Sequence, residues 1–210
     1  MVNPIIVVNV KCYEKATGKD VLAIASACEQ TGAWIAAQST DLYRISSQTG
    51  AKVYAQHIDP VGFGSHTGAV TADAVLSAGA EGTLLNHSEK RLSFDVLKSS
   101  VMHARNAGLS VIVCAENLSE AKKFDSLQAD FIALELPELI GGDVSIVDSD
   151  PELIKNAVSS LDTPVLVGAG VHSGEDVRAA MSFGAAGVLL ASAVAKKTTD
   201  PLSVLEDLRG

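Results

Sequence analysis

Polar side chains capable of acid–base chemistry stand at the ends of short apolar runs in this sequence. Asn9 and Lys11 close the first such run, His87 follows a later one and Glu135 follows another. An amine, an imidazole and a carboxylate are common partners in proton transfer, and together they indicate far more than any one alone. Taken singly, each residue has an ordinary structural explanation. A lysine after a strand is usually a solvated rim residue, as Lys11 would be. A histidine in a loop is usually a structural hydrogen-bonding group, as His87 would be, and a carboxylate at a strand end often caps the next helix, as Glu135 would. The question is whether the fold brings them together.

Two turns later in the chain have the composition of an anion-binding site. Gly168-Ala169-Gly170 follows one apolar run, and Ala191-Ser192 follows the next. Glycine lets the backbone approach a ligand closely, and free N–H groups at the start of a helix attract phosphate. The alternative is that both are only tight turns.

The elements that would position these residues are eight short, continuous apolar runs. Such runs are typical of strands buried on both faces, as in a parallel sheet. The expected strands are Ile5–Asn9, Trp34–Ala37, Lys52–Gln56, Gly82–Asn86, Val111–Cys114, Phe131–Leu134, Val165–Gly168 and Val188–Ala191.

Segments with helical spacing separate the runs. Ser, Thr or Asp precedes several of them as a candidate N-cap, and Gly32, Gly108 and Gly184 follow three of them as candidate C-terminal caps. The expected helices are Lys19–Gln30, Ala72–Ala78, Phe94–Ala107, Glu116–Leu127, Pro151–Leu161, Gly174–Phe183 and Pro201–Leu208, with a weaker one within Thr40–Gln48.

Eight strands alternating with helices predict parallel strands joined by right-handed crossovers. The two candidates are a closed barrel and an open, doubly wound sheet. No G-x-G-x-x-G follows the first strand, and the short repeat fits a compact barrel. We therefore expect an α/β fold, a single-domain (β/α)₈ TIM barrel spanning residues 1–210. Its active site would lie where the strands end, which is where Asn9, Lys11, His87 and Glu135 stand.

Composition narrows the class of protein further. A net charge of −9 without a basic stretch argues against nucleic acid or an anionic membrane as a partner. The three cysteines are far apart, which fits reduced thiols in the cytoplasm rather than disulfides or a zinc site. We see no signal peptide and no apolar stretch long enough to span a bilayer, so we expect a cytoplasmic protein.

Several blocks of the sequence form a recognisable series. They are Asn9-Val10-Lys11, Gln56-His57-Ile58-Asp59-Pro60 with Gly64–Gly68, Asn86-His87-Ser88-Glu89-Lys90-Arg91, Glu135–Gly141, Gly168-Ala169-Gly170 and Leu190-Ala191-Ser192. In this order they resemble the triosephosphate isomerase family, in its short archaeal-type branch, over nearly the whole chain. Leu136, where Pro is common in the family, and Gly142-Asp143, in place of Thr-Gly, are departures. They bear on the hinges of the lid that follows the base, not on the chemical groups.

The resemblance implies an intramolecular aldose–ketose isomerase that interconverts D-glyceraldehyde 3-phosphate and dihydroxyacetone phosphate in glycolysis and gluconeogenesis. Glu135 would be the base, His87 the electrophile, Lys11 the cation and Asn9 a hydrogen-bond donor, the division of labour known for the family. Glu89 would support them. Asn9 and Lys11 would also bind substrate, and backbone near Ile140, Gly170, Ala191 and Ser192 would hold its phosphate. No metal or organic cofactor is implied.

The resemblance also implies self-association. The Gly64–Gly68 loop would dock into a second subunit, with Thr67 near that subunit's Lys11 site. The assembly would be at least a homodimer, with a homotetramer as the larger alternative. Two other functions stay open on the residues alone. A different phosphate-binding barrel enzyme would share the turns after the last two strands, and a non-catalytic barrel would be a binding module.

Overall fold

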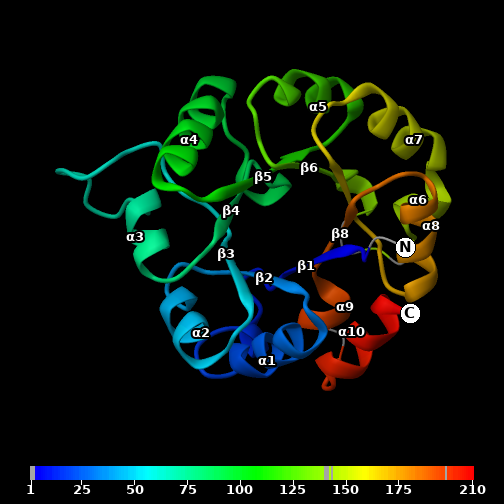
Figure 1. The fold of residues 1–210 in the computed structure, drawn as a ribbon, viewed down its shortest axis with the longest axis horizontal. Coiled ribbons are helices and arrows are strands. Elements are labelled where there is room, and N and C mark those ends of the chain that lie inside the picture. Colours follow the sequence, from blue (N-terminus) through cyan, green and yellow to red (C-terminus); the bar gives the residue numbers. More distant parts are fainter. Residues whose placement is uncertain (1–2, 140–141, 143, 197) are drawn as a thin grey trace.

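The computed structural model describes residues 3–139, 142, 144–196 and 198–210. Eight parallel strands pair in sequence order and close on themselves, with β1 hydrogen-bonded to β8 as well as to β2. The helices surround this barrel (Figure 1). The expected closed (β/α)₈ barrel is therefore confirmed, and the open sheet is excluded.

All eight predicted strands are present, with each end within one residue of its expected position. They are β1 (Ile5–Asn9), β2 (Trp34–Ala37), β3 (Lys52–Ala55), β4 (Gly82–Leu85), β5 (Ser110–Ala115), β6 (Phe131–Leu134), β7 (Val165–Gly168) and β8 (Gly187–Leu190). Three predicted ends were one residue too far along: Gln56, Asn86 and Ala191 lie just beyond their strands.

The described helices follow the predicted segments and add two short ones, α6 and α9, after β6 and β8. They are α1 (Val21–Thr31), α2 (Leu42–Gln48), α3 (Ala72–Ser77), α4 (Phe94–Ala107), α5 (Leu118–Asp125), α6 (Ile146–Ser149), α7 (Pro151–Ser160), α8 (Gly174–Ser182), α9 (Ser192–Ala195) and α10 (Pro201–Arg209). Helix α5 begins two residues later than predicted because Asn117 caps it, accepting a hydrogen bond from the N–H of Glu120.

Two apolar layers form the core. The larger lies between strands and helices, and the smaller fills the inside of the barrel with residues such as Val7, Ala36 and Tyr54. Tyr54 needs a glycine opposite, because a Cβ on Gly82 would lie 2.2 Å from its ring. No helix within the described ranges is both long and apolar enough to cross a bilayer.

Candidate active site

A pocket opens at the mouth of the barrel where the strands end. Two of its polar side chains lie on the same strand face as the apolar residues that fill the barrel. Val7 and Ala133 lie inside the barrel, and successive side chains of a strand alternate between its faces. Asn9 and Glu135, two residues further along, therefore face the inside as well. The lining residues are Asn9, Lys11, Tyr13, His87, Glu135, Ala169, Gly170, Val171, His172, Leu189, Leu190, Ala191 and Ser192. Seven of the eight residues predicted for the site thus lie around one pocket. The eighth, Ile140, falls outside the described residues.

Glu135 is a buried carboxylate with an unused acceptor. Its side chain is 8% exposed, and its Oε2 has no hydrogen-bond partner among the described residues. Burial raises the pKa of the Glu135 carboxyl above its usual range, and the nearby His87 opposes the shift. A buried acceptor without a partner is rare in folded proteins and marks a group that is kept for an external ligand.

Gly168 makes the room for this carboxylate. A Cβ at Gly168 would lie 2.4 Å from Cγ of Glu135, which is closer than such atoms approach. The glycine at the end of β7 is therefore needed for the packing of the acid at the end of β6. It contributes no group of its own.

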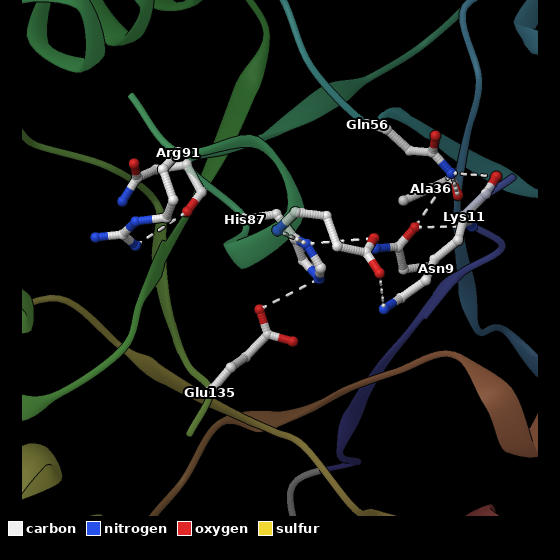
Figure 2. A network of polar contacts seen from close by, with 9 residues as sticks. Asn9, Lys11, Ala36, Gln56, His87, Arg91 and Glu135 are labelled. Atoms are coloured by element: carbon white, nitrogen blue, oxygen red, sulfur yellow. Dashed lines mark hydrogen bonds and ion pairs between the residues drawn. The ribbon is translucent and has the colours of Figure 1, made fainter. Parts of the chain in front are cut away.

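His87 presents one defined nitrogen to the pocket. The backbone N–H of Glu89 donates to Nδ1 of His87 at 3.1 Å, so Nδ1 is an acceptor and the ring proton belongs on Nε2. That Nε2 lies 3.6 Å from Oε2 of Glu135 (Figure 2). A hydrogen-bond donor and a carboxylate therefore face the same small space.

Lys11 is held in a strained backbone conformation with φ of 49°. Its N–H donates to Oδ1 of Asn9 at 3.0 Å, and its carbonyl accepts from Nε2 of Gln56 at 3.0 Å. Its Nζ pairs with Oε1 of Glu89 at 2.8 Å. Strain of this kind survives only where the surroundings hold it, and it is concentrated at functional sites. The ammonium is thus placed at the pocket by three neighbours.

Gln56 orients Asn9 as well. Its Nε2 donates to Oδ1 of Asn9 at 3.1 Å and lies 3.3 Å from the carbonyl of Ala36 (Figure 2). With the oxygen of Asn9 occupied by two donors, the –NH₂ end of this amide is the one left to donate to a ligand. The sequence placed Gln56 at the end of the third strand and in the docking block with Gly64–Gly68, but its role beside Asn9 was missed.

Asn86 anchors the loop that carries His87. Its Nδ2 donates to the carbonyl of Cys114 at 3.0 Å, and its Oδ1 accepts from the N–H of Leu92 at 2.9 Å. Arg91 donates to the Asn86 carbonyl at 3.3 Å (Figure 2) and pairs with acids on the α5 side. Asn86, with φ of 63°, is a second residue in left-handed backbone at this mouth.

The opposite wall of the pocket is backbone rather than charge. Gly170 has φ of 72°, and a Cβ there would lie 2.0 Å from the carbonyl oxygen of Val144. Ala191 immediately precedes α9, whose first residue is Ser192. The first N–H groups of a helix lack partners within it, so this wall offers donors to an anion, as expected for a phosphate cradle.

The comparisons with known proteins agree along the whole chain. The family model described as triosephosphate isomerase matches residues 4–206. The chain belongs to the triosephosphate isomerase family. Curated triosephosphate isomerases from Methanosarcina mazei and Methanoculleus marisnigri are 41% and 42% identical to it, each over 99% of this chain and 98% of the relative. The expectation drawn from the sequence blocks is confirmed.

The solved structures agree on the fold. The crystal structure of triosephosphate isomerase from Bartonella henselae matches with a TM-score of 0.71 and 20% identity, covering all of both chains. In the present chain, the pocket residues with polar side chains that were not predicted are Tyr13 and His172. Tyr13 lies two residues beyond Lys11, and His172 lies two residues beyond Gly170. Extending each recognised motif by two residues would have included both.

Proposed function

We propose that this chain interconverts D-glyceraldehyde 3-phosphate and dihydroxyacetone phosphate, the aldose–ketose isomerisation of glycolysis and gluconeogenesis, with Glu135 as the base. The observation that carries the proposal is the buried Oε2 of Glu135, without a partner among the described residues, facing Nε2 of His87. The whole chain acts as one catalytic domain in the cytoplasm, in keeping with the family's role in glycolysis and the three free cysteines.

The chemistry follows from these groups. Glu135 removes a proton from the carbon next to the carbonyl and returns it to the former carbonyl carbon, while the hydroxyl proton passes to the former carbonyl oxygen. As negative charge develops on the substrate oxygens, Nε2–H of His87 and the amide of Asn9 donate to them, and the ammonium of Lys11 offsets the charge. The raised pKa of Glu135 makes it a stronger base than an exposed carboxylate would be.

The phosphate is held on the other side of the pocket. Backbone N–H groups near Gly170, Ala191 and Ser192 would bind it, with Lys11 adding positive charge. Ile140 belongs to the same proposal, on the strength of the sequence resemblance. Binding through backbone donors explains how an acidic protein of net charge −9 would accept an anionic substrate.

A coupled isomerase assay on the purified protein tests the proposal. We expect turnover of both triose phosphates by the wild type and a loss of about 10²–10⁴-fold in kcat for Glu135→Gln, the range for a general base. Glu81→Gln is the matched control, because Glu81 is exposed at the other end of the barrel. Full activity in Glu135→Gln, or none in the wild type, would refute the proposed function.

The arm between β3 and α3 supports a homo-oligomer. It reaches away from the barrel (Figure 1), and Phe63 on it is 84% exposed. Asp59 joins the two ends of the arm: its N–H donates to the carbonyl of Val70, and its Oδ2 accepts from the N–H of that residue. An arm that is fixed at its base and carries an exposed aromatic side chain fits docking into a second copy through Gly64–Gly68. The assembly is at least a homodimer, with a homotetramer as the larger alternative.

Light scattering after gel filtration tests this assembly. We expect a mass of at least two chains, and a shift toward one chain for Phe63→Ser. Tyr43→Ser is the control, because Tyr43 is a 70% exposed aromatic on α2, away from the arm. A wild type that stays a single chain at micromolar concentration would contradict the proposal.

A further inference from the structure

The imidazole of His172 joins two loops on the phosphate side of the pocket. It follows β7, and its Nε2 lies 2.9 Å from the carbonyl oxygen of Gly142, in the segment that follows Glu135 and β6. His172 also lines the pocket itself. A side chain that is both a wall of the pocket and a link between its two loops is in a position to couple them.

The base of His172 is fixed by the start of α8. Oδ2 of Asp176 accepts hydrogen bonds from the backbone N–H of His172 at 2.8 Å and of Ser173 at 3.0 Å, and Ser173 caps the helix in return. These hydrogen bonds fix the backbone at His172 to the first turn of the helix. The imidazole is therefore held from a rigid element.

Backbone contacts join the same two loops further along. The N–H of Ile146 donates to the carbonyl of Ala169 at 3.3 Å, and Gly170 lies directly against the backbone of Val144 and Ser145. The bond from His172 extends this line of contacts to Gly142, closer along the chain to Glu135. Among the described residues, it adds a side-chain hydrogen bond to these backbone contacts.

We propose that His172 is a positioning residue that ties the segment after Glu135 to the phosphate-side turn and thereby keeps the substrate's phosphate enclosed during isomerisation. This inference rests on the proposed function. The enediolate can lose its phosphate: the C–O bond breaks, inorganic phosphate leaves with the bonding electrons, and the carbon skeleton becomes methylglyoxal. An active site that stays enclosed disfavours this side reaction.

The link requires a donor at one particular atom. A carbonyl oxygen only accepts, so Nε2 of His172 must carry a proton. Both the neutral Nε2–H ring and the imidazolium satisfy this, so the link does not depend on charge. A Gln side chain can place its amide –NH₂ near the position of Nε2, whereas Asn is too short to reach it. His172→Gln should preserve the link and His172→Asn should lose it.

The experiment measures inorganic phosphate released per isomerisation turnover, with kcat and KM. For His172→Asn and His172→Ala we expect the phosphate-release ratio to rise about tenfold, the effect of one lost hydrogen bond, and KM to rise with it. His172→Gln should return both toward the wild-type values. His103→Ala is the control, because its ring also contacts a backbone carbonyl, on α4 and outside the pocket lining.

Hydrogen–deuterium exchange of the ligand-free proteins provides a readout that does not depend on activity. Peptides covering residues 142–149 should exchange faster in His172→Asn and His172→Ala than in the wild type and His172→Gln. Equal exchange in all four proteins, or a phosphate-release ratio that Gln does not rescue, would overturn the inference. Failure of the proposed function is a different result: the wild type would lack isomerase activity whatever the exchange rates.

Discussion

The two mouths of the barrel are built from the same eight strands, yet one is packed with aromatic side chains and the other holds polar groups in a strained backbone. At the starts of β2 and β6, Trp34 and Phe131 pack edge to face at 5.7 Å, and Trp34 stacks on Tyr54 at 5.1 Å. Nζ of Lys52 lies 3.9 Å above the Trp34 ring, so this mouth is closed by an aromatic plug. We use the term aromatic plug for Trp34, Tyr54, Phe131 and the covering Lys52.

At the other mouth, three residues that lie one or two positions after a strand end adopt left-handed backbone although none is glycine: Lys11, Asn86 and Ala169. Such conformations cost of order 1–3 kcal/mol each, and the buried carboxylate of Glu135 adds a further cost. Residues that stabilise the fold and residues that carry the chemistry are therefore separated along the strand direction. The aromatic plug stabilises the fold by packing, whereas the polar groups held at the strained mouth lower its stability.

The sharpest test of the separation is Gly168→Ala. The added Cβ would overlap Glu135, so we expect the carboxylate to move and kcat to fall about 10²-fold, the cost of a misplacement of about 1 Å. Thermal unfolding should change far less than activity. An unchanged kcat would mean that Glu135 does not need its observed position.

Trp34→Ala tests the opposite mouth. Removing a partly buried ring from the aromatic plug should lower the free energy of unfolding by about 2–3 kcal/mol, somewhat below the range for fully buried aromatics. At temperatures well below unfolding, kcat should stay within twofold or so of the wild type. Denaturant melts monitored by circular dichroism measure the free energy of unfolding, and the coupled assay measures kcat. A large loss of kcat would show that the two mouths are not independent.

The pH dependence of stability tests the cost assigned to Glu135. Its pKa is raised in the folded protein, so the folded state binds the proton more tightly than the unfolded state. Stability from this group is therefore greatest below the unfolded value near 4.5 and is lost as the pH rises through the folded pKa. Glu135→Gln should gain stability relative to the wild type over that rise, measured by denaturant melts from pH 4 to pH 8. Glu81→Gln, which removes an exposed carboxylate, is the matched control under the same conditions.

The smallest expected effect is that of Lys52→Ala. The ammonium over Trp34 sits at a partly exposed site, where a cation–π contact contributes about 0.5–1 kcal/mol. Unfolding should shift by that amount and kcat should not change. Stabilisation by the substitution would show that the contact with Trp34 does not contribute to the plug.

The barrel could be predicted because its strands are buried on both faces. Runs such as Val165–Gly168 are continuously apolar, so their ends are visible in the sequence, and the residue that follows each run falls at the mouth. The ends of the helices were harder to predict from the sequence. The side chain of Asn117 determines where α5 begins, and a cap of this kind competes with the apolar spacing that suggested an earlier start at Glu116.

The missed parts of the site depend on the path of loops. His172 reaches Gly142 across 30 residues of sequence, and Gln56 reaches Asn9 across 47. No periodicity encodes such contacts, because they arise only once β6 lies beside β7 and β3 near β1. The left-handed backbone at Lys11 was equally invisible, since lysine has no preference for it.

The pairing of β1 with β8 also dictates an order of events during synthesis. Ile5 of β1 pairs with Gly187 of β8. One edge of the first strand therefore has no pairing partner until almost the entire polypeptide has been synthesised. Until then the nascent sheet is open and presents unpaired amides and carbonyls to other chains. Unfinished copies that lie close together on a polysome are therefore exposed to edge-to-edge aggregation.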